Sequence, residues 1–368
     1  MTFAAGQPKV SVVMIFLNAE KFLDEAVRSV LTQSYEGVEL LLCDDGSTDE
    51  STAMALAWQR RHSDKVRYLA HPGHTHRGMS ATRNLGIAGA DGELLAFLDS
   101  DDVWLPDHLQ HEVECLLGHP EAAAVCGRAL DWHSWDGSGR ADVWSPLPCP
   151  SGTVLRPPAM LTAVLRQGGY STPVCSLLVR RDVVMALGGS DDSFTSMYED
   201  QVLLAKLYLT QSVVVSGART ALYRQHAGSS TAEAIRRGLY HPMARNRSSE
   251  AYLRWLQQQP QLHGANGDPD LAAALREALL PYQSITWRVS VRVRTTAVGR
   301  TAVMIWRAFA NRGRRLRCRL SRLRGWASEV QPAAIVVLLR TRRRGAGRRE
   351  ADSERAGVPN DKRRFPAP

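Results

Sequence analysis

The strongest constraint on the fold is a regular alternation between short apolar runs and longer amphipathic stretches in the first hundred residues. Runs such as residues 9–16 (KVSVVMIF) and 38–43 (VELLLC) are typical of parallel strands buried on both faces. The stretches between them have helical spacing, as in residues 18–34, where Asn18 is placed to cap a helix. This β-α-β-α-β-α-β order predicts an α/β fold with an open, mostly parallel sheet flanked by helices.

Acidic residues follow two of these predicted strands directly. Asp44 and Asp45 end one run, and the octet FLDSDDVW (residues 97–104) brings three more carboxylates after another. Like charges this close raise one another's pKa unless a cation or hydrogen-bond donors compensate them. Because ligands of open α/β sheets bind beyond the carboxyl ends of the strands, the clusters favour a binding site over solvated capping turns. The three carboxylates of the octet are Asp99, Asp101 and Asp102.

The chain contains neither a GxGxxG nor a GxxxxGK[ST] pattern, so no dinucleotide fingerprint or P-loop is predicted. A diphosphate could instead be held through Mg²⁺ or Mn²⁺ bound to carboxylates. In that arrangement the Asp44–Asp45 turn could accept hydrogen bonds from a base or ribose. A third acidic pair, Glu199–Asp200, could supply a general base toward an incoming hydroxyl.

Basic residues concentrate at the end of the chain. Residues 281–368 hold 22 Lys and Arg against 5 Asp and Glu, so the preceding residues carry a net acidic balance. Between residues 281 and 344, Arg alternates with apolar and aromatic residues at roughly helical spacing. This pattern favours a segment that lies on an anionic membrane surface over a solvated charged tail. Residues 345–368 have the composition of a disordered tail.

Cysteine usage and hydropathy bear on the compartment. The six cysteines are scattered without a CxxC pair, which argues against a disulfide framework and fits a reducing compartment. No stretch reaches the roughly 18 apolar residues that span a bilayer, and the N-terminus has no signal-peptide pattern. These features predict a cytoplasmic protein that associates with the inner face of the cell membrane through its basic segment.

Four stretches together resemble the successive motifs of family 2 glycosyltransferases with the GT-A fold. They are VSVVMIFLNAE, CDDGSTDES, RGMSATRNLGIAGADGELLAFLDSDD and GGSDDSFTSMYEDQVLLAKL, within residues 8–230. The resemblance implies transfer of a sugar, with inversion, from a nucleotide diphosphate sugar, often a UDP-sugar. The acceptor would be a hydroxyl of a glycan, polysaccharide or lipid-linked precursor. One departure is the run at 15–17 (IFL), where many family members have a Pro-Thr-Tyr-like sequence.

Matching the motifs residue by residue assigns expected roles. The turn at Asp44 and Asp45 would recognise the nucleotide base, while Asp99 and Asp101 would form the DxD motif that contacts ribose and metal. Asp200 would deprotonate the acceptor hydroxyl. The remaining candidates are Asn18, Arg83 and Asn84 in the nucleotide pocket, Glu199 beside the catalytic base, and Asp102 and His226 as further metal ligands.

The expected organisation is a glycosyltransferase domain over residues 1–230, a helical extension over 231–280, the basic segment and the tail. A sugar-phosphate nucleotidyltransferase is an alternative, although it normally needs a glycine-rich basic loop after the first strand. A nucleic-acid-binding protein is a second alternative, based on the Arg-rich end, but no nucleic-acid-binding motif supports it. A short polar loop over the nucleotide site explains His71, His74 and His76 better than a zinc site does. A second group, Trp132, Trp135 and Trp144, could form a sugar platform or pack in the interior.

Overall fold

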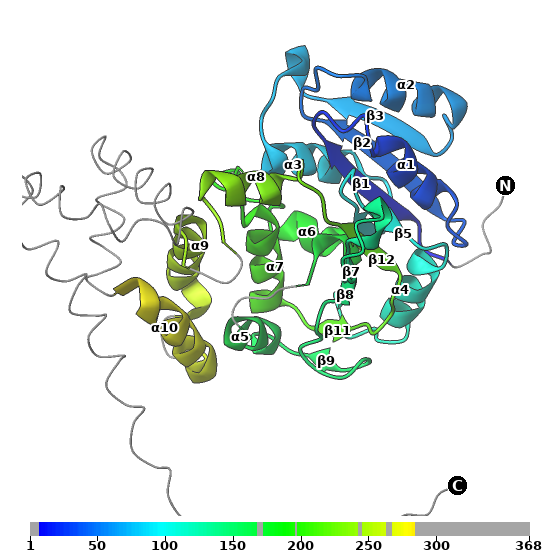
Figure 1. The fold of residues 1–368 in the computed structure, drawn as a ribbon. Helices are drawn as coiled ribbons and strands as arrows, with labels where there is room; N and C mark the ends of the chain where they lie inside the picture. Colours follow the sequence, from blue (N-terminus) through cyan, green and yellow to red (C-terminus); the bar gives the residue numbers. More distant parts are fainter. Residues whose placement is uncertain (1–6, 168–171, 196, 242–244, 263–266, 284–368) are drawn as a thin grey trace, which may run out of the picture. The chain divides into compact units, whose positions relative to one another are not determined.

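The computed structural model describes residues 7–167, 172–195, 197–241, 245–262 and 267–283. Nearly all of the predicted basic segment and the whole predicted tail lie outside these residues. Figure 1 shows a large sheet between two layers of helices. The mixed α/β class predicted from the alternating runs is confirmed.

The large sheet has eight strands in the order β3-β2-β1-β4-β10-β6-β11-β9. Its first half is parallel, as predicted: β1 pairs with β2 and β4, and β2 pairs with β3. In its second half, β10 runs antiparallel between β4 and β6. The sequence did not predict this, because an apolar run carries no information about strand direction. The strands are β1 (Val10–Phe16), β2 (Val38–Asp44), β3 (Val66–Ala70), β4 (Leu94–Phe97), β6 (Ala124–Cys126), β9 (Val154–Leu155), β10 (Leu177–Arg180) and β11 (Val213–Val215).

A smaller sheet, which the sequence did not predict, has the order β5-β12-β7-β8. The apolar run at residues 122–130 (AAAVCGRAL) forms two strands, divided at Gly127, whose N–H donates to the Ser176 carbonyl where the chain passes from one sheet to the other. This sheet places residues after β12 beside the octet that follows β4. Its strands are β5 (Val103–Trp104), β7 (Ala129–Trp132), β8 (Val143–Trp144) and β12 (Ala221–Arg224).

Alternate residues of β1 supply the two apolar cores. Val10, Val12 and Met14 pack with α1 (Leu23–Leu31), α2 (Ser51–Arg61) and α4 (His108–Leu117). Val13 and Ile15 face the opposite core. The helices contributing to that core are α3 (Met79–Gly89), α5 (Ala159–Arg166), α6 (Arg181–Ala186), α7 (Glu199–Thr210), α9 (Arg247–Gln257) and α10 (Pro269–Gln283).

The helical stretch after residue 230 does not have a core of its own. Apolar side chains of α9 and α10, among them Tyr252, Leu256 and Leu275, belong to the same buried cluster as the sheet. The same apolar core therefore continues across the predicted boundary at residue 230. The remaining helices are α8 (Ser230–Arg237) and the 3₁₀ turns η1 (Pro72–His74), η2 (Ser134–Asp136), η3 (Val174–Ser176) and η4 (Pro260–Leu262).

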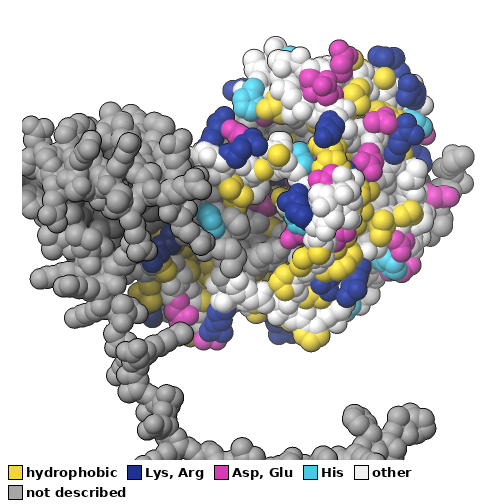
Figure 2. All heavy atoms as spheres, viewed as in Figure 1, with side chains coloured by type: hydrophobic (Ala, Val, Ile, Leu, Met, Phe, Trp, Pro, Cys, Tyr) yellow, Lys and Arg dark blue, Asp and Glu magenta, His cyan; other side chains and the backbone are white. Residues whose placement is uncertain are grey.

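Charged side chains of both signs are interspersed over the part of the surface formed by α1 and α2 (Figure 2). The described residues contain no helix long and apolar enough to cross a membrane. The five described cysteines are free thiols, three of them buried.

Candidate functional site

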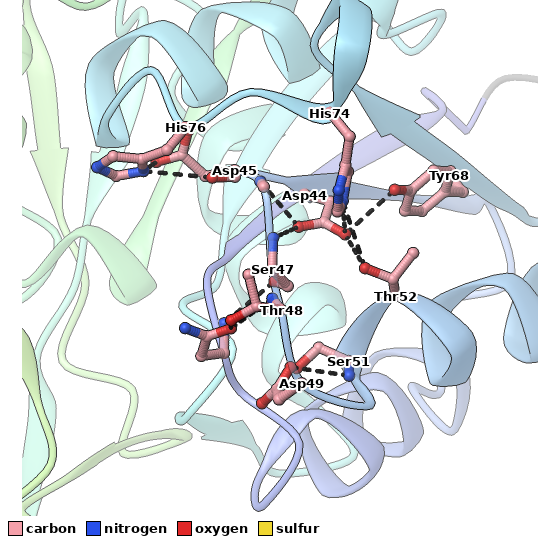
Figure 3. Close-up of polar contacts among 12 residues, drawn as sticks. Asp44, Asp45, Ser47, Thr48, Asp49, Ser51, Thr52, Tyr68, His74 and His76 are labelled. Atoms are coloured by element: carbon pink, nitrogen blue, oxygen red, sulfur yellow. Dashed lines mark hydrogen bonds and ion pairs between the residues drawn. The ribbon is translucent and has the colours of Figure 1, made fainter.

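The first acidic turn, Asp44–Asp45, is stabilised by hydrogen bonds from its own surroundings (Figure 3). Asp44 has no exposed surface, and its Oδ1 accepts the N–H groups of Gly46 and Ser47 at 3.1 and 2.8 Å. Its Oδ2 is 2.5 Å from the Thr52 hydroxyl, 3.1 Å from that of Tyr68 and 3.0 Å from His74 Nε2.

These bonds decide the ionisation of Asp44. Burial alone would raise its pKa, but the hydrogen bonds from Thr52, His74 and Ser47 outweigh it and hold the pKa below the usual value. The predicted contact of Asp44 with a nucleotide would require the loss of one of these bonds. Asp44 as placed orients the turn.

Asp45 fixes the loop that precedes α3. Its carboxylate accepts the N–H groups of Arg77 and Gly78 at 2.7 and 3.0 Å, and His76 Nδ1 lies 2.9 Å from Oδ2 (Figure 3). The three histidines of this loop have separate partners, since His71 bonds Thr82 and His74 bonds Asp44. The polar-loop interpretation therefore fits them, and the described residues contain no three-ligand metal cluster of any kind.

Asn18 does not cap the first helix, contrary to prediction, because α1 begins five residues later with Phe22 at its N-cap position. Asn18 instead has a left-handed backbone, with φ of 53°, directly after β1. Its Oδ1 accepts the Thr48 N–H at 2.8 Å, and its own N–H donates to Ser47 Oγ at 3.1 Å. Asn18 thereby joins the end of β1 to the first acidic turn.

Arg83 links the second acidic turn to the start of α7. Its guanidinium is fully buried against the Phe97 ring and forms an ion pair with Glu199. A second contact of 3.6 Å reaches Asp99 Oδ1. Burial, with Asp101 and Asp200 nearby, raises the pKa of Asp99 to about 6 despite the pull of Arg83.

The two carboxylates of the third acidic pair have different environments. Glu199 is buried and committed to Arg83, and its burial raises its pKa against the effect of that ion pair. Asp200 is partly exposed, and within the described part of the chain its carboxylate accepts the backbone and side-chain N–H groups of its neighbour Gln201 and no others. Tyr198, which precedes them with a left-handed φ of 70°, stacks on Tyr252 at 5.1 Å.

The Asn84 side chain forms hydrogen bonds with the backbone of the loop before α7. Its Oδ1 accepts the Ser190 N–H at 2.8 Å, and its Nδ2 donates to the Ser190 carbonyl at 3.0 Å. A Cβ on Gly189 would lie 2.4 Å from the Asn84 Oδ1, so this close approach requires glycine. Asn84 therefore holds the segment that leads into α7.

Asp101 of the octet lies beside a second candidate ligand, His226, which follows β12. Asp101 Oδ2 and His226 Nε2 are 2.9 Å apart, and the Asp101 side chain is 27% exposed. Asp102 is buried; its Oδ1 accepts the Arg224 N–H at 2.9 Å, and its Oδ2 has no hydrogen-bond partner among the described residues. Burial and the neighbouring Asp101 and Asp99 raise its pKa well above the usual value.

This donor set fits a divalent cation that is shared with a substrate. Asp101 offers a hard carboxylate oxygen and His226 an imidazole nitrogen. No third protein ligand converges with them among the described residues, so the structure does not gather Asp102 into the site. Mg²⁺ typically takes one or two carboxylates and completes its shell with substrate phosphates and water, which these two residues would allow.

Arg224 is the residue that the sequence analysis missed. Its guanidinium lies 4.8 Å from the Phe22 ring, 4.4 Å from Trp132 and 5.0 Å from Trp135. Its Nε donates to the Asp101 carbonyl at 2.7 Å, and an ion pair of 2.6 Å joins it to Glu25 of α1. Trp132 and Trp135, two of the three tryptophans considered as a sugar platform, thus pack against the Arg224 guanidinium.

Comparison with known proteins gives a consistent result. Residues 11–181 match the model of Glycosyl transferase family 2. An uncharacterized glycosyltransferase of Nostoc sp. is 39% identical over 29% of this chain and 32% of its own length. Putative glycosyltransferase EpsE of Bacillus subtilis is 37% identical over 30% of this chain and 40% of its own length.

A relative with a stated activity is UDP-Glc:alpha-D-GlcNAc-diphosphoundecaprenol beta-1,3-glucosyltransferase WfgD of Escherichia coli. It is 33% identical over 29% of this chain and 41% of its own length. The chain therefore matches about a third to two fifths of the length of these relatives.

Solved structures share the fold. S. aureus TarS 1–349 in complex with UDP superimposes with a TM-score of 0.54 at 18% identity, covering 78% of this chain and 76% of that one. Its complex with UDP-GlcNAc gives a TM-score of 0.56 at 20% identity, with the same coverage. At this identity the likeness shows a GT-A-type fold.

Proposed function

We propose that this chain, whose residues 11–181 match the model of Glycosyl transferase family 2, transfers a sugar from a nucleotide diphosphate sugar to an acceptor hydroxyl, with inversion. The proposed donor is a UDP-sugar, and TarS, which shares the fold, has been solved with UDP and with UDP-GlcNAc. The proposed acceptor is a glycan, polysaccharide or lipid-linked sugar. The activity for which WfgD is named uses an acceptor of the last kind.

The observation that carries the proposal is the pairing of Asp101 with His226, 2.9 Å apart, beyond the carboxyl end of β4. In a parallel half-sheet this edge is where ligands bind. Asp101 and His226 would hold Mg²⁺ or Mn²⁺, which would offset negative charge on the leaving diphosphate. The first acidic turn and its His71–Gly78 loop would border the nucleotide.

Asp200 is the better placed base of its pair. Glu199 is buried against Arg83, whereas Asp200 keeps a partly exposed carboxylate in the first turn of α7. An ionised carboxylate within reach of the acceptor can take the proton as the hydroxyl attacks the anomeric carbon from the face opposite the diphosphate.

Contact between residues 281–344 and an anionic membrane remains a prediction from sequence. A chain whose acceptor is lipid-linked would gain from such contact, because the acceptor is confined to the same surface.

The proposal is tested by titrating the full chain with UDP in a calorimeter, with and without Mn²⁺, followed by a hydrolysis and transfer screen of UDP-sugars. We expect UDP binding that strengthens with Mn²⁺ and falls to the metal-free level in Asp101→Ala. Absence of binding by UDP and by other nucleoside diphosphates in Mn²⁺ would overturn the donor assignment. Release of pyrophosphate from a nucleoside triphosphate and a sugar phosphate would instead identify a nucleotidyltransferase.

A further inference from the structure

Two arginines of the small sheet share one tryptophan. Arg128 precedes β7, Arg219 precedes β12, and Trp144 lies in β8. The guanidinium carbon of Arg128 is 5.6 Å from the Trp144 ring centroid, and that of Arg219 is 5.7 Å from it. The two cations therefore converge on one aromatic side chain from different strands.

No carboxylate compensates this pair within the described part of the chain. Neither guanidinium has an ion pair or a side-chain hydrogen bond there, and Nε of Arg128 is buried without an acceptor. Burial and the charge of Arg219 lower the pKa of Arg128. By contrast, Arg67, Arg83 and Arg224 each face a carboxylate.

Two arginines without a carboxylate partner favour the binding of an anion. Nε of Arg128 is a buried donor without an acceptor, which is unfavourable, and the positive charge of Arg219, whose side chain is exposed, acts on the same guanidinium. An oxyanion beside Trp144 would accept a hydrogen bond from Nε of Arg128 and offset the charge of Arg219, since the planar fork of arginine matches phosphate and carboxylate oxygens. The aromatic ring beside them offers a face on which a sugar can pack.

Trp144 lies on the same face of the small sheet as Arg224, which borders the candidate active site. Trp144 is opposite Leu130 in the β7–β8 ladder, and Trp132 is opposite Arg224 in the β7–β12 ladder. Residues 130 and 132 share one face because side chains alternate along a strand. Two residues along a strand and one strand across amount to roughly 10 Å, so an extended acceptor could reach both places.

We propose that Arg128, Arg219 and Trp144 form an acceptor subsite that binds a phosphate or diphosphate group attached to the acceptor sugar. The inference rests on the proposed function, because it names the substrate class for the same reaction. Phosphate is preferred to a single carboxylate because two unpaired cations match the charge of a phosphate ester or diphosphate. The subsite would then select phosphate-linked acceptors over neutral glycans.

The test uses inorganic pyrophosphate as the probe, titrated into the full chain in EDTA so that metal-dependent donor binding does not contribute. The variants are Arg128→Gln, Arg219→Gln and their combination. Arg140→Gln is the matched control, because Arg140 is an exposed arginine whose Nε lies 3.5 Å from Ser138 Oγ. We expect the double variant to lose at least about tenfold in pyrophosphate affinity, with the control unchanged.

Two further readouts separate this subsite from a structural role and from the donor site. Thermal midpoints of the variants should equal or exceed the wild-type value, because each substitution removes a repulsion. UDP binding in Mn²⁺ should be unchanged. Equal pyrophosphate affinity in wild type and double variant, or equally tight binding of glucuronate, would overturn the phosphate subsite. Loss of UDP binding in the wild type itself would instead overturn the proposed function.

Discussion

The two acidic turns have similar sequences but opposite electrostatic states. In the first, Asp44 and Asp45 accept hydrogen bonds from their own loop and its neighbours, and the pKa of Asp44 is lowered. In the second, the pKa values of Asp99 and Asp102 are raised, and Asp102 Oδ2 has no hydrogen-bond partner among the described residues. The first turn is complete without a ligand, whereas the second gathers carboxylates whose ionised forms the protein compensates only in part.

The difference separates carboxylates that stabilise the fold from carboxylates that remain available to a ligand. A carboxylate whose oxygens are filled by donors stabilises the folded chain but offers few lone pairs to a ligand. Carboxylates that repel one another cost stability, and a cation that binds them recovers it. We therefore expect changes in the second turn to affect activity and changes in the first turn to affect folding.

The largest effect is expected for Asp101→Asn. The substitution keeps the shape of the side chain but removes the negative charge opposite His226. We expect transfer to fall by at least about 10²–10³-fold, the scale of losing one transition-state electrostatic contact. The fall should appear in the turnover of a UDP-sugar assay while the thermal midpoint stays the same or rises. Activity within threefold of wild type would contradict the contrast between the turns.

A smaller but specific effect is expected for Arg224→Lys. Lysine keeps the charge but cannot donate to the Asp101 carbonyl in the same geometry while stacking between Phe22 and Trp132. We expect Mn²⁺ affinity, measured in the presence of UDP, to weaken by about 10–100-fold, as for changes beside metal ligands. Arg28→Lys is the control, since Arg28 also pairs with a carboxylate and contacts a tryptophan ring.

A double-mutant cycle separates positioning from folding. If Arg224 acts through the Asp101–His226 pair, Arg224→Lys should add little to His226→Ala in Mn²⁺ affinity. Additive losses would show that Arg224 supports the fold in general instead of this pair.

The sequence predicted the parallel half of the sheet and the positions of both acidic turns, because apolar runs and strand-end carboxylates are local patterns. It did not predict β10 antiparallel to β4, or the small sheet, because strand direction depends on contacts between distant segments. Arg224 was missed for the same reason. Its partners Glu25, Trp132 and Asp101 are brought together only by the small sheet.

Asp44→Asn tests the first turn through stability. Its folded-state pKa lies below the ordinary 3.8, so ionised Asp44 contributes stability above about pH 4, which is lost as the pH falls through the folded value. We expect Asn to lower the free energy of unfolding by about 2 kcal/mol at pH 7 and by less near pH 3. Urea unfolding at the two pH values measures this. A loss that does not shrink in acid would show that hydrogen-bond geometry, and not charge, holds the turn.

The smallest effect is expected for His76→Gln, at the exposed rim of the same turn. His76 contacts Asp45, but its side chain is 62% exposed, so water screens the interaction. Asp45 also keeps the N–H groups of Arg77 and Gly78 when this contact is lost. We expect less than about 0.5 kcal/mol in stability and less than a threefold change in UDP affinity. A larger loss in UDP affinity alone would mean that the imidazole itself contacts the nucleotide, and the first turn would then also take part directly in binding.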